Sequence, residues 1–336
     1  MKDLGKISAT RHKVGEEADG QRLDNYLLKL LKGVPKSHIY RIVRSGEVRV
    51  NRGRAAPDYR VRAGDELRLP PVRVAERSAV RRVAPANAQL ERAILFEDEY
   101  LLALDKPAGL AVHGGSGVSH GVIEQLRALR SQAKFLELVH RLDRDTSGVL
   151  LLAKKRSALT GLHAELRAGR VTKQYLALVK GKWRDQKRHV RLNLHKYVLP
   201  SGERRVSVDA GGRESHTIFR LKRAWPDFSL LQAELKTGRT HQIRVHLAHL
   251  GFPIVGDEKY GDFDFNKRLA PKLKRMFLHA SSIGFTHPAT GENVEIEAPL
   301  PKELAAFLAG IERAGGDPEA GHAGSGSELL ERPRYT

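Results

Sequence analysis

Cysteine is absent from all 336 residues of the chain. This absence excludes disulfides, thiolate nucleophiles and cysteine-ligated zinc, so covalent chemistry would have to use oxygen or nitrogen. Long apolar runs are absent too: the longest, residues 149–153, has strand length, whereas a membrane-spanning helix needs roughly 18–20 residues. The first residues also lack the apolar segment of a secretory signal peptide. We therefore expect a cytoplasmic protein that has no membrane partner.

Acidic residues are scarce relative to basic ones. The chain has 39 Asp and Glu against 59 Lys and Arg, a formal net charge of +20. A surplus of this size predicts a polyanionic partner, usually nucleic acid, because phosphate contacts release condensed counterions. A membrane surface would attract the chain as well, but the basic residues are not gathered on one amphipathic helix. Hydrophobic residues make up 40% of the chain, enough for one large core or two smaller ones.

Residues 14–72 have the pattern of a small α/β module. Apolar residues recur at helical spacing from Leu23, a second short helix would bury Ile39, and Val48 and Val50 alternate with polar residues as in a half-buried strand. The outward positions are basic through helix, strand and turn, with few acids between them. A solvated charged face is the alternative, but this continuity favours RNA binding. The candidate RNA contacts are Lys36, Arg41, Arg44, Arg49, Arg52 and Arg54.

The rest of the chain divides by composition. Residues 1–13 are predicted to be a flexible N-terminus, and residues 73–92, rich in Arg, Ala and Pro, a linker. Residues 93–312 alternate short apolar strands with a few helices, which predicts a mixed, largely antiparallel sheet and an α+β fold class. Residues 313–336 are rich in Gly and Ser and are expected to be disordered.

The most informative segment is LVHRLDRDTSGVLLLAKK, residues 138–155. A polar loop lies between two apolar segments, and such loops commonly carry catalytic side chains. Asp143 is flanked by Arg141 and Arg144, and nearby cations keep a carboxylate ionised and able to act as nucleophile or base. By itself an Asp before Thr-Ser-Gly is more often a turn residue, the role we expect for Asp145. A glycosidase pair is disfavoured, because paired carboxylates flank the scissile bond from opposite sides.

Two further segments carry candidate residues. Residues 171–179 alternate as a strand does, and Tyr175 would be either a core aromatic or a stacking platform for an extruded base. In residues 235–261, Arg239 and Arg244 are candidates for phosphate or carboxylate partners. The histidines of this segment, at positions 241, 246 and 249, lack the spacing of a helical zinc site, so no metal is expected. The Gly-rich stretch of residues 104–117 matches neither a P-loop nor a dinucleotide-binding motif.

Together these segments resemble the RluA-type pseudouridine synthases from residue 14 to about 310. The family motif H-R-L-D-x-x-T-S-G is complete at residues 140–148. Around it, in the family's order, are the block N-K-P-x-G-x-x-V-H (with Asp105 in place of Asn), K-x-Y-x-A-L-V, G-R-T-H-Q-I-R-V-H and G-D-x-x-Y-G. The N-terminal module resembles an S4-type RNA-binding domain, through R-L-D-x-x-L, V-P-K-S, G-x-V-x-V-N and G-D-x-L.

The resemblance implies isomerisation of uridine to pseudouridine in 23S, the large-subunit ribosomal RNA, with base flipping and without a cofactor. Asp143 would be the catalytic carboxylate, Arg244 would pair with it and hold it ionised, and Tyr175 would stack on the flipped uracil. Arg141 would occupy the space left by the extruded base, while Arg239 and His241 are expected to bind substrate. Three roles stay open for the carboxylate: attack at C1′, attack at C6 of the ring, or removal of a sugar proton.

Two rival functions differ from this expectation. One is a non-enzymatic RNA-binding factor for ribosome assembly, against which the complete set of Asp143, Tyr175 and Arg244 argues. The other is a metal-dependent nuclease or glycosidase, disfavoured because the sequence offers no cluster of carboxylates. We expect a monomer whose partner is 23S ribosomal RNA, either as naked RNA or in large-subunit assembly intermediates.

Overall fold

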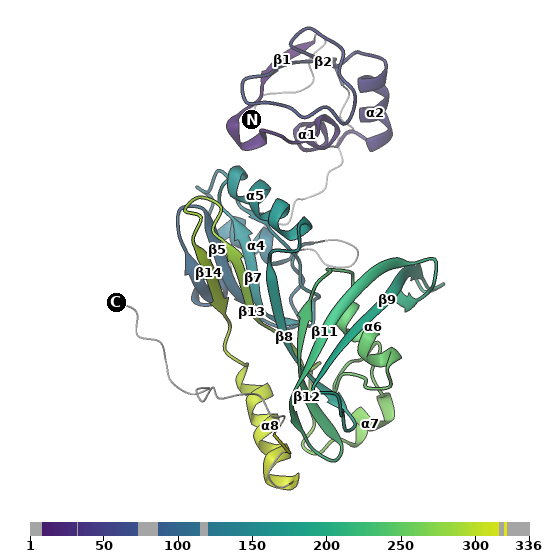
Figure 1. The fold of residues 1–336 in the computed structure, drawn as a ribbon. Coiled ribbons are helices and arrows are strands. Elements are labelled where there is room, and N and C mark those ends of the chain that lie inside the picture. The colour runs from purple at the N-terminus through teal and green to yellow at the C-terminus, as the bar shows by residue number, and fades with distance from the viewer. Residues whose placement is uncertain (1–8, 32, 73–86, 115–119, 316–318, 321–336) are drawn as a thin grey trace.

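Two separate sheets organise the molecule, which confirms the α+β fold class. The computed structural model describes residues 9–31, 33–72, 87–114, 120–315 and 319–320. The small sheet has three strands in the order β1-β3-β2. The large sheet has twelve strands and forms the body of the rest of the chain (Figure 1). No helix within these residues is long and apolar enough to cross a membrane.

The small domain has the elements that its apolar spacing predicts. Leu23 and Leu27 of one helix and Ile39 and Ile42 of the next are buried against one another in a core confined to this domain. Its elements are β1 (Thr10–Lys13), the short helix η1 (Glu16–Ala18), α1 (Leu23–Leu30), α2 (Lys36–Arg44), β2 (Arg49–Val50) and β3 (Glu66–Leu69).

The structure corrects the predicted boundaries at three places. Strand β1 lies within the segment expected to be flexible and pairs antiparallel with β3, so Thr10 faces Leu69. Helix α3 (Ala88–Arg92) lies within the expected linker, and its Leu90 is buried in the large core. Helix α8 (Lys302–Gly315) and strand β15 (Glu319–Ala320), which pairs with β11, extend into the expected disordered tail. The remainder of those segments lies outside the described residues.

The large sheet is antiparallel except where β13 pairs with β7. Its strands run in the order β10-β9-β11-β12-β8-β13-β7-β5-β4, with β14, β15 and β6 paired at the side of this path. Their bounds are β4 (Ile94–Glu97), β5 (Leu101–Lys106), β6 (Glu137–Leu138), β7 (Ser147–Ala153), β8 (Thr172–Lys180), β9 (Lys187–Val198), β10 (Arg204–Val208), β11 (Arg213–Ala224), β12 (Phe228–Leu235), β13 (Leu278–Thr286) and β14 (Asn293–Glu297). A mixed, largely antiparallel sheet was predicted and is confirmed.

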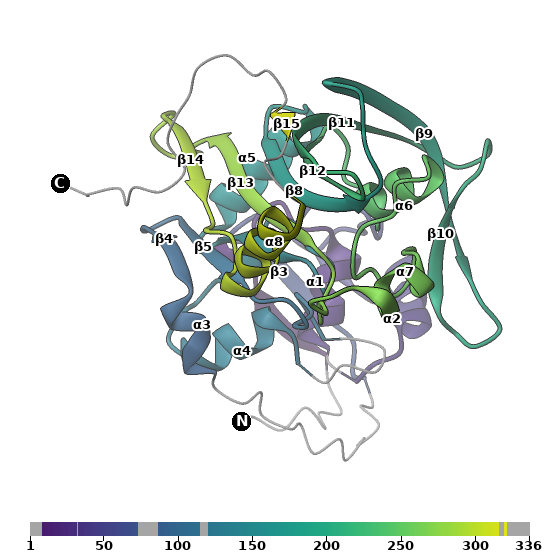
Figure 2. The same cartoon turned by 90° about the horizontal axis from the view of Figure 1, so that it is seen from below.

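Helices cover both faces of this sheet, which explains why β7 is apolar at nearly every position. Leu150 and Leu152 pack on one face with helices α4 (Val122–Leu129), α6 (Gln242–His249) and α8. The alternate residues Val149 and Leu151 pack on the other face under α5 (Arg156–Arg167). Strand side chains point alternately to opposite faces, so a strand buried on both needs a continuous apolar run. Figure 2, seen from below, brings α8 to the front.

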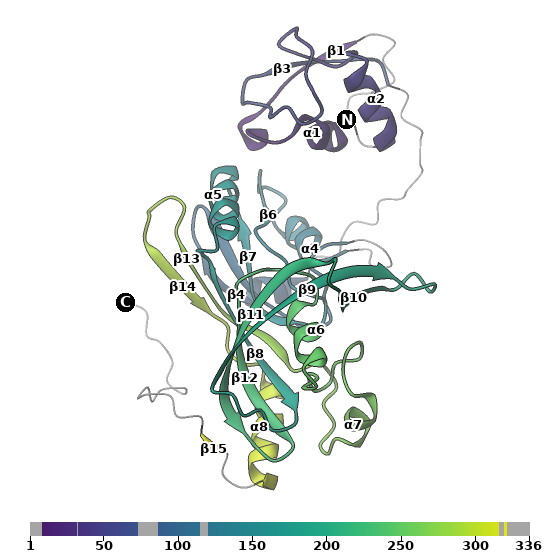
Figure 3. The same ribbon diagram turned by 45° about the vertical axis from the view of Figure 1, so that its right-hand side comes forward.

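The hairpin of β9 and β10 is the part of the large sheet that extends farthest to the side (Figure 3). Val206 of β10 pairs with Lys196 of β9, and this hairpin lies beside α6. Helix α7 (Phe263–Arg268) follows in the segment that links α6 to β13. Strands β11 and β12 separate this hairpin from α6 in the chain, so the contact brings together segments two strands apart.

Candidate active site

Asp143 lies in the loop that joins β6 to β7, where the sequence placed it. The backbone N–H of Thr146 donates to the carbonyl of Asp143 at 3.2 Å, which closes a turn. Gly148 then pairs with Ala280 of β13 at a φ of +108°, and a Cβ there would lie 2.1 Å from the carbonyl oxygen of Ala280. Only glycine can bring the two backbones this close, so Gly148 fixes the position at which the Asp143 loop joins β7.

A buried lysine supports the same loop from beneath. Lys106, at the end of β5, is fully buried and donates from Nζ to the carbonyls of Pro107 at 2.7 Å, Leu110 at 2.8 Å and Arg144 at 3.0 Å. Burial lowers the pKa of Lys106 to about 7, against the opposing effect of Asp145 and Asp143. Its three bonds tie the strand end to the residue that follows the candidate catalytic carboxylate.

Helix α6 begins in a fixed geometry because of one buried amide. Gln242 accepts from the Thr237 hydroxyl at 2.8 Å and from the Arg239 backbone N–H at 3.0 Å. It also donates to the carbonyl of His216 at 3.0 Å. The residue before it, His241, has a left-handed backbone with a φ of +53°. Residues in such sparsely populated backbone conformations cluster at active sites, and the ring of His241 lies beside Asp143.

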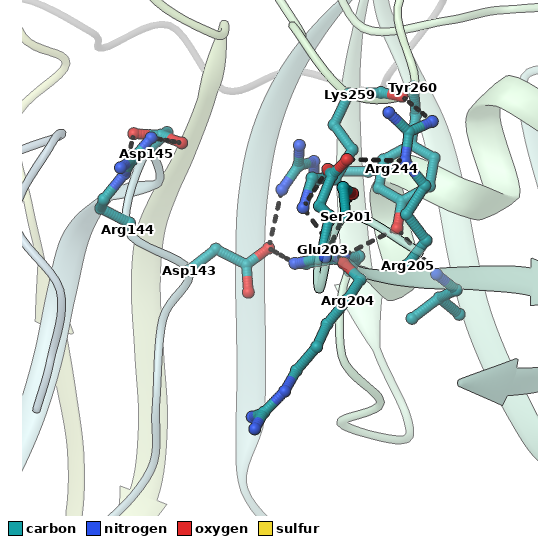
Figure 4. Close-up of polar contacts among 12 residues, drawn as sticks. Asp143, Arg144, Asp145, Ser201, Glu203, Arg204, Arg205, Arg244, Lys259 and Tyr260 are labelled. Atoms are coloured by element: carbon teal, nitrogen blue, oxygen red, sulfur yellow. Dashed lines mark hydrogen bonds and ion pairs between the residues drawn. The ribbon is translucent and has the colours of Figure 1, made fainter. Parts of the chain in front are cut away.

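Arg244 of α6 connects two carboxylates, of which Figure 4 shows Asp143. Its Nη1 donates to Oδ2 of Asp143 at 3.3 Å, and its Nε and Nη2 bind the two oxygens of Asp257 at 2.7 and 2.8 Å. Burial acts to lower the pKa of Arg244, but the bonds and charge of Asp257, and then of Asp143, raise it above its usual value. The guanidinium is therefore a permanent cation whose plane is set by Asp257.

The cation that faces Asp143 is thus not one of its sequence neighbours. Arg144 was expected to help hold the carboxylate ionised, but its side chain turns to Asp145, with Nε 3.1 Å from Oδ1. Arg141 is exposed at the edge of the pocket. Adjacent side chains of an extended loop point in different directions, so adjacency in sequence did not give adjacency in space.

His241 is the second group beside the carboxylate. Its Nε2 lies 3.8 Å from Oδ2 of Asp143, and its Nδ1 lies 2.8 Å from the hydroxyl of Tyr260. Burial lowers the pKa of His241 to about 4, although the charge of Asp143 acts in the opposite direction. The imidazole is therefore neutral at neutral pH.

Tyr175 lies on β8, as the alternation of its segment predicted, and is both a core aromatic and a residue of the pocket wall. It is 6% exposed and belongs to the large core, yet it lines the same pocket as Asp143. Burial, and then the charge of Asp143, raise the pKa of Tyr175 above its usual value. Its hydroxyl therefore stays protonated over the physiological pH range.

The pocket beside these residues has a volume of about 580 Å³, the size of a small-ligand site. Among the described residues that line it, Asp143 is the only acid. The lining cations are Arg141, Arg167, Lys173, Lys236, Arg239 and Arg244. A second, wider pocket of about 1650 Å³ lies on the other side of Asp143 and also includes Arg141, His241 and Arg244. Asp143 thus lines both pockets: the first is otherwise charged only by cations, whereas the second is lined by acids as well.

In the part of the chain that the structure describes, no group of three or more His, Cys, Asp or Glu side chains is placed so that it could hold a metal ion. Two of the three histidines considered from the sequence have other partners. His246 is fully buried and bonds the Ser215 hydroxyl at 2.7 Å, while His241 contacts Tyr260. Residues 115–117 of the Gly-rich stretch lie outside the described residues.

The six candidate RNA contacts lie in the small domain, on a different sheet from the pocket. All are exposed except Arg49, which is half-buried in β2. Lys36, Arg41 and Arg44 share helix α2, and Arg52 lies in the tight turn after β2 with a φ of +70°. The geometry keeps these cations together on one domain and does not bring them to Asp143.

Known proteins match the chain along most of its length. A model of the RNA pseudouridylate synthase family matches residues 100–249, and a model of the S4 domain matches residues 21–67. Ribosomal large subunit pseudouridine synthase C of Yersinia pestis is 55% identical over 294 residues, covering 87% of this chain and 92% of that protein. The chain belongs to the RluA-type family of RNA pseudouridine synthases. The resemblance stated from its motifs is confirmed.

Other relatives of the synthase agree. The proteins of the same name from Haemophilus influenzae and Escherichia coli K12 are each 54% identical, covering 88% of this chain and 92% and 94% of their own lengths. Among solved structures, Human RNA Pseudouridylate Synthase Domain Containing 4 has a TM-score of 0.55 at 25% identity, covering 66% of the synthase and 94% of that chain. The related human Domain Containing 1 structure has a TM-score of 0.53 at 25% identity, covering 68% and 96%.

Three residues of the site received no role from the sequence. Asp257 and Tyr260 belong to the G-D-x-x-Y-G block, and Lys106 belongs to the K-P block, so the family motifs contained them. Each contacts a residue 13 to 38 positions away in the chain: Asp257 binds Arg244, Tyr260 binds His241, and Lys106 binds the Asp143 loop. Only their place in the family motifs could have identified them, because local periodicity does not predict contacts between separate segments.

Proposed function

We propose that the synthase isomerises uridines of large-subunit ribosomal RNA to pseudouridine, with Asp143 as the catalytic carboxylate. The observation that carries this is one partly exposed acid, paired with Arg244, at a pocket whose other charged lining groups are cations. A carboxylate flanked by a cation-lined pocket suits a reaction on a nucleotide, whose phosphate needs positive partners. The relatives named above are, by name, ribosomal large-subunit enzymes.

In the proposed reaction the N1–C1′ bond breaks, the uracil rotates, and C5 bonds to C1′. The hydrogen on C5 leaves as a proton and N1 gains one, so the nucleotide keeps its composition and needs no cofactor or metal. Asp143 serves as nucleophile or base, and Arg244 holds its negative charge in place. Tyr175 stacks on the uracil, and its hydroxyl, which stays protonated, is available to move a proton.

Substrate binding divides between the two domains in this proposal. Arg239 and His241 contact the flipped nucleotide, and Arg141 fills the space that the base leaves in the RNA stack. The small domain supplies electrostatic affinity through Lys36, Arg41, Arg44, Arg49, Arg52 and Arg54. The synthase acts as a monomer in the cytoplasm on 23S RNA or a large-subunit assembly intermediate. Loop uridines are the easier substrates, because they leave the stack at lower cost.

Tritium release from 23S RNA labelled at uracil C5 tests the reaction, because forming the C5–C1′ bond must expel that hydrogen. We expect release by the wild type in the presence of EDTA and none by Asp143→Asn, which keeps the side-chain size and removes the charge. Asp145→Asn is the matched control, since Asp145 pairs with Arg144 and does not line the pocket that holds Tyr175. It is expected to release tritium at close to the wild-type rate.

Two results would change the proposal. Equal release by wild type and Asp143→Asn would remove Asp143 from the reaction. No release from naked or partly assembled RNA would favour a non-enzymatic assembly factor. RNA binding is a separate test: affinity is expected to fall about 10³-fold or more between roughly 50 and 200 mM salt, with a smaller slope for Arg41→Ala combined with Arg44→Ala.

A further inference from the structure

Both polar contacts of Asp143 converge on one of its two oxygens. Arg244 Nη1 and His241 Nε2 lie 3.3 and 3.8 Å from Oδ2. Within the described residues, no hydrogen bond reaches Oδ1, and Figure 4 shows that oxygen pointing away from the two contacts of Oδ2. The carboxylate is therefore held asymmetrically, with one oxygen bound from the protein side and the other free to meet a substrate.

The hydrogen-bond partners of His241 decide which ring nitrogen carries its proton. The backbone N–H of Val206 donates to the Tyr260 hydroxyl oxygen at 2.9 Å. With that oxygen accepting from Val206, the phenolic hydrogen is available for Nδ1 of His241, 2.8 Å away. The proton of the neutral imidazole then sits on Nε2, where it faces the negative oxygen of Asp143. The opposite tautomer would turn a lone pair toward that oxygen, which is repulsive.

Tyr260 itself is held from two sides. Its backbone N–H donates to Asp257 Oδ1 at 3.0 Å, in the same carboxylate that binds Arg244. On the other side, Lys259 Nζ donates to the Arg204 carbonyl at 3.1 Å and lies 2.8 Å from Glu203 (Figure 4). The turn that carries Tyr260 is therefore fastened both to the Arg244 pair and to the β9–β10 hairpin. Its hydroxyl has little freedom to leave Nδ1.

We propose that His241 is a positioning residue in the neutral Nε2–H form, set by Tyr260, and that it joins Arg244 in holding Oδ2 so that Oδ1 is the reacting oxygen. The distance of 3.8 Å is longer than a hydrogen bond, so in the free protein the Nε2–H group acts through its dipole. The role in the reaction rests on the proposed function, whereas the tautomer is a property of the free protein and is tested without substrate.

The first experiment reads the tautomer directly. Long-range proton–nitrogen NMR correlations of the full chain, with isotope-labelled histidine near neutral pH, distinguish the two ring nitrogens, and His241→Gln identifies the resonances. We expect a protonated Nε2 and an unprotonated Nδ1 in the wild type. Tyr260→Phe is expected to shift these resonances toward a mixture of tautomers, and Tyr197→Phe, an exposed tyrosine of β9, to leave them unchanged. A proton on Nδ1 in the wild type would overturn the proposal.

The second experiment uses two amides that mimic different ring nitrogens. The side-chain nitrogen of Gln reaches the place of Nε2, whereas that of Asn reaches only the place of Nδ1. We expect His241→Gln to retain kcat for tritium release within about 5-fold, and His241→Asn to lose about 10- to 100-fold in kcat with a smaller change in KM. Backbone strain acts against this order, because Asn tolerates the left-handed conformation of position 241 better than Gln.

Other outcomes separate the two proposals. Equal activity of the Gln and Asn variants would refute the positioning role of His241. A loss of folding in both would show as altered thermal unfolding, and the NMR result on Tyr260→Phe would then decide alone. If the wild type releases no tritium while Nε2 is protonated, the proposed function fails and the tautomer assignment stands.

Discussion

Replacing Asp257 by Asn is expected to lower the free energy of unfolding by about 3 kcal/mol, the lower end of the range for breaking a buried ion pair. The Arg244 and Asp257 side chains are only 6% and 1% exposed. Asn can offer one oxygen to the guanidinium but turns its amide nitrogen toward a second N–H. Two charge-assisted bonds of about 1.5–3 kcal/mol each are at stake. Asp143 remains beside the cation, so the loss stays near the lower value.

Urea unfolding followed by tryptophan fluorescence measures this change. Trp183 and Trp225 are the only tryptophans of the chain, and both are buried in the large domain, so their signal reports that domain alone. Asp264→Asn is the matched control, because its partner Lys267 is 3.9 Å away and both side chains are about four-fifths exposed. Such surface pairs contribute about 0–1 kcal/mol. A loss below 1 kcal/mol for Asp257→Asn would refute the reasoning.

The loss of stability in Asp257→Asn is also expected to depend on pH in a definite direction. Burial acts to raise the pKa of Asp257, but the bond and charge of Arg244 lower it below its usual value. A carboxyl with a lowered folded-state pKa contributes stability that is present above its unfolded pKa, about 3.9, and is lost as the pH falls through the folded value. The difference between wild type and variant should therefore be full near neutral pH and shrink in acid. A difference that grows on acidification would contradict the pairing.

Three further changes test other parts of the site. Gly148→Ala should lose about 3 kcal/mol or more in urea unfolding, because its Cβ would meet the Ala280 carbonyl at 2.1 Å in a positive-φ conformation. Lys106 has a pKa of about 7 when folded and about 10.5 when unfolded, so the unfolded chain holds more protons between these values. Wild type should gain up to about 1.4 kcal/mol per pH unit there relative to Lys106→Met. Tyr175→Phe should lower kcat for tritium release while RNA affinity stays within about 2-fold, since stacking remains.

Two of these changes have a control in the same chain. Gly284→Ala on β13 adds a Cβ that meets nothing nearer than 3.7 Å, and equal losses at the two glycines would contradict the close approach at Gly148. Lys302→Met at an exposed lysine should leave the pH dependence unchanged. An unaltered kcat for Tyr175→Phe would show that the hydroxyl takes no part in the chemistry.

Local patterns predicted the parts of the molecule whose cause is local. The helices of the small domain follow from apolar spacing, and the strand of Tyr175 from alternation. The partner of Asp143 did not follow from its neighbours, because Arg244 lies 101 residues along the chain and only the family motif connected them. Strand β1 and helix α3 were missed for the same reason. Elements this short are marginal alone and form through tertiary pairing, which leaves no periodicity to read.

The core of the small domain is separate from the cores around the large sheet, and this separation affects how such an enzyme can evolve. Every buried apolar residue of the small domain packs within residues 14–72, and none belongs to the cores around the large sheet. Substitutions in one core therefore leave the packing of the other intact. The small domain can therefore change in sequence, or be replaced, while the surroundings of Asp143 stay the same. The domain that carries the candidate RNA contacts and the domain that carries the active site can therefore evolve separately within one chain.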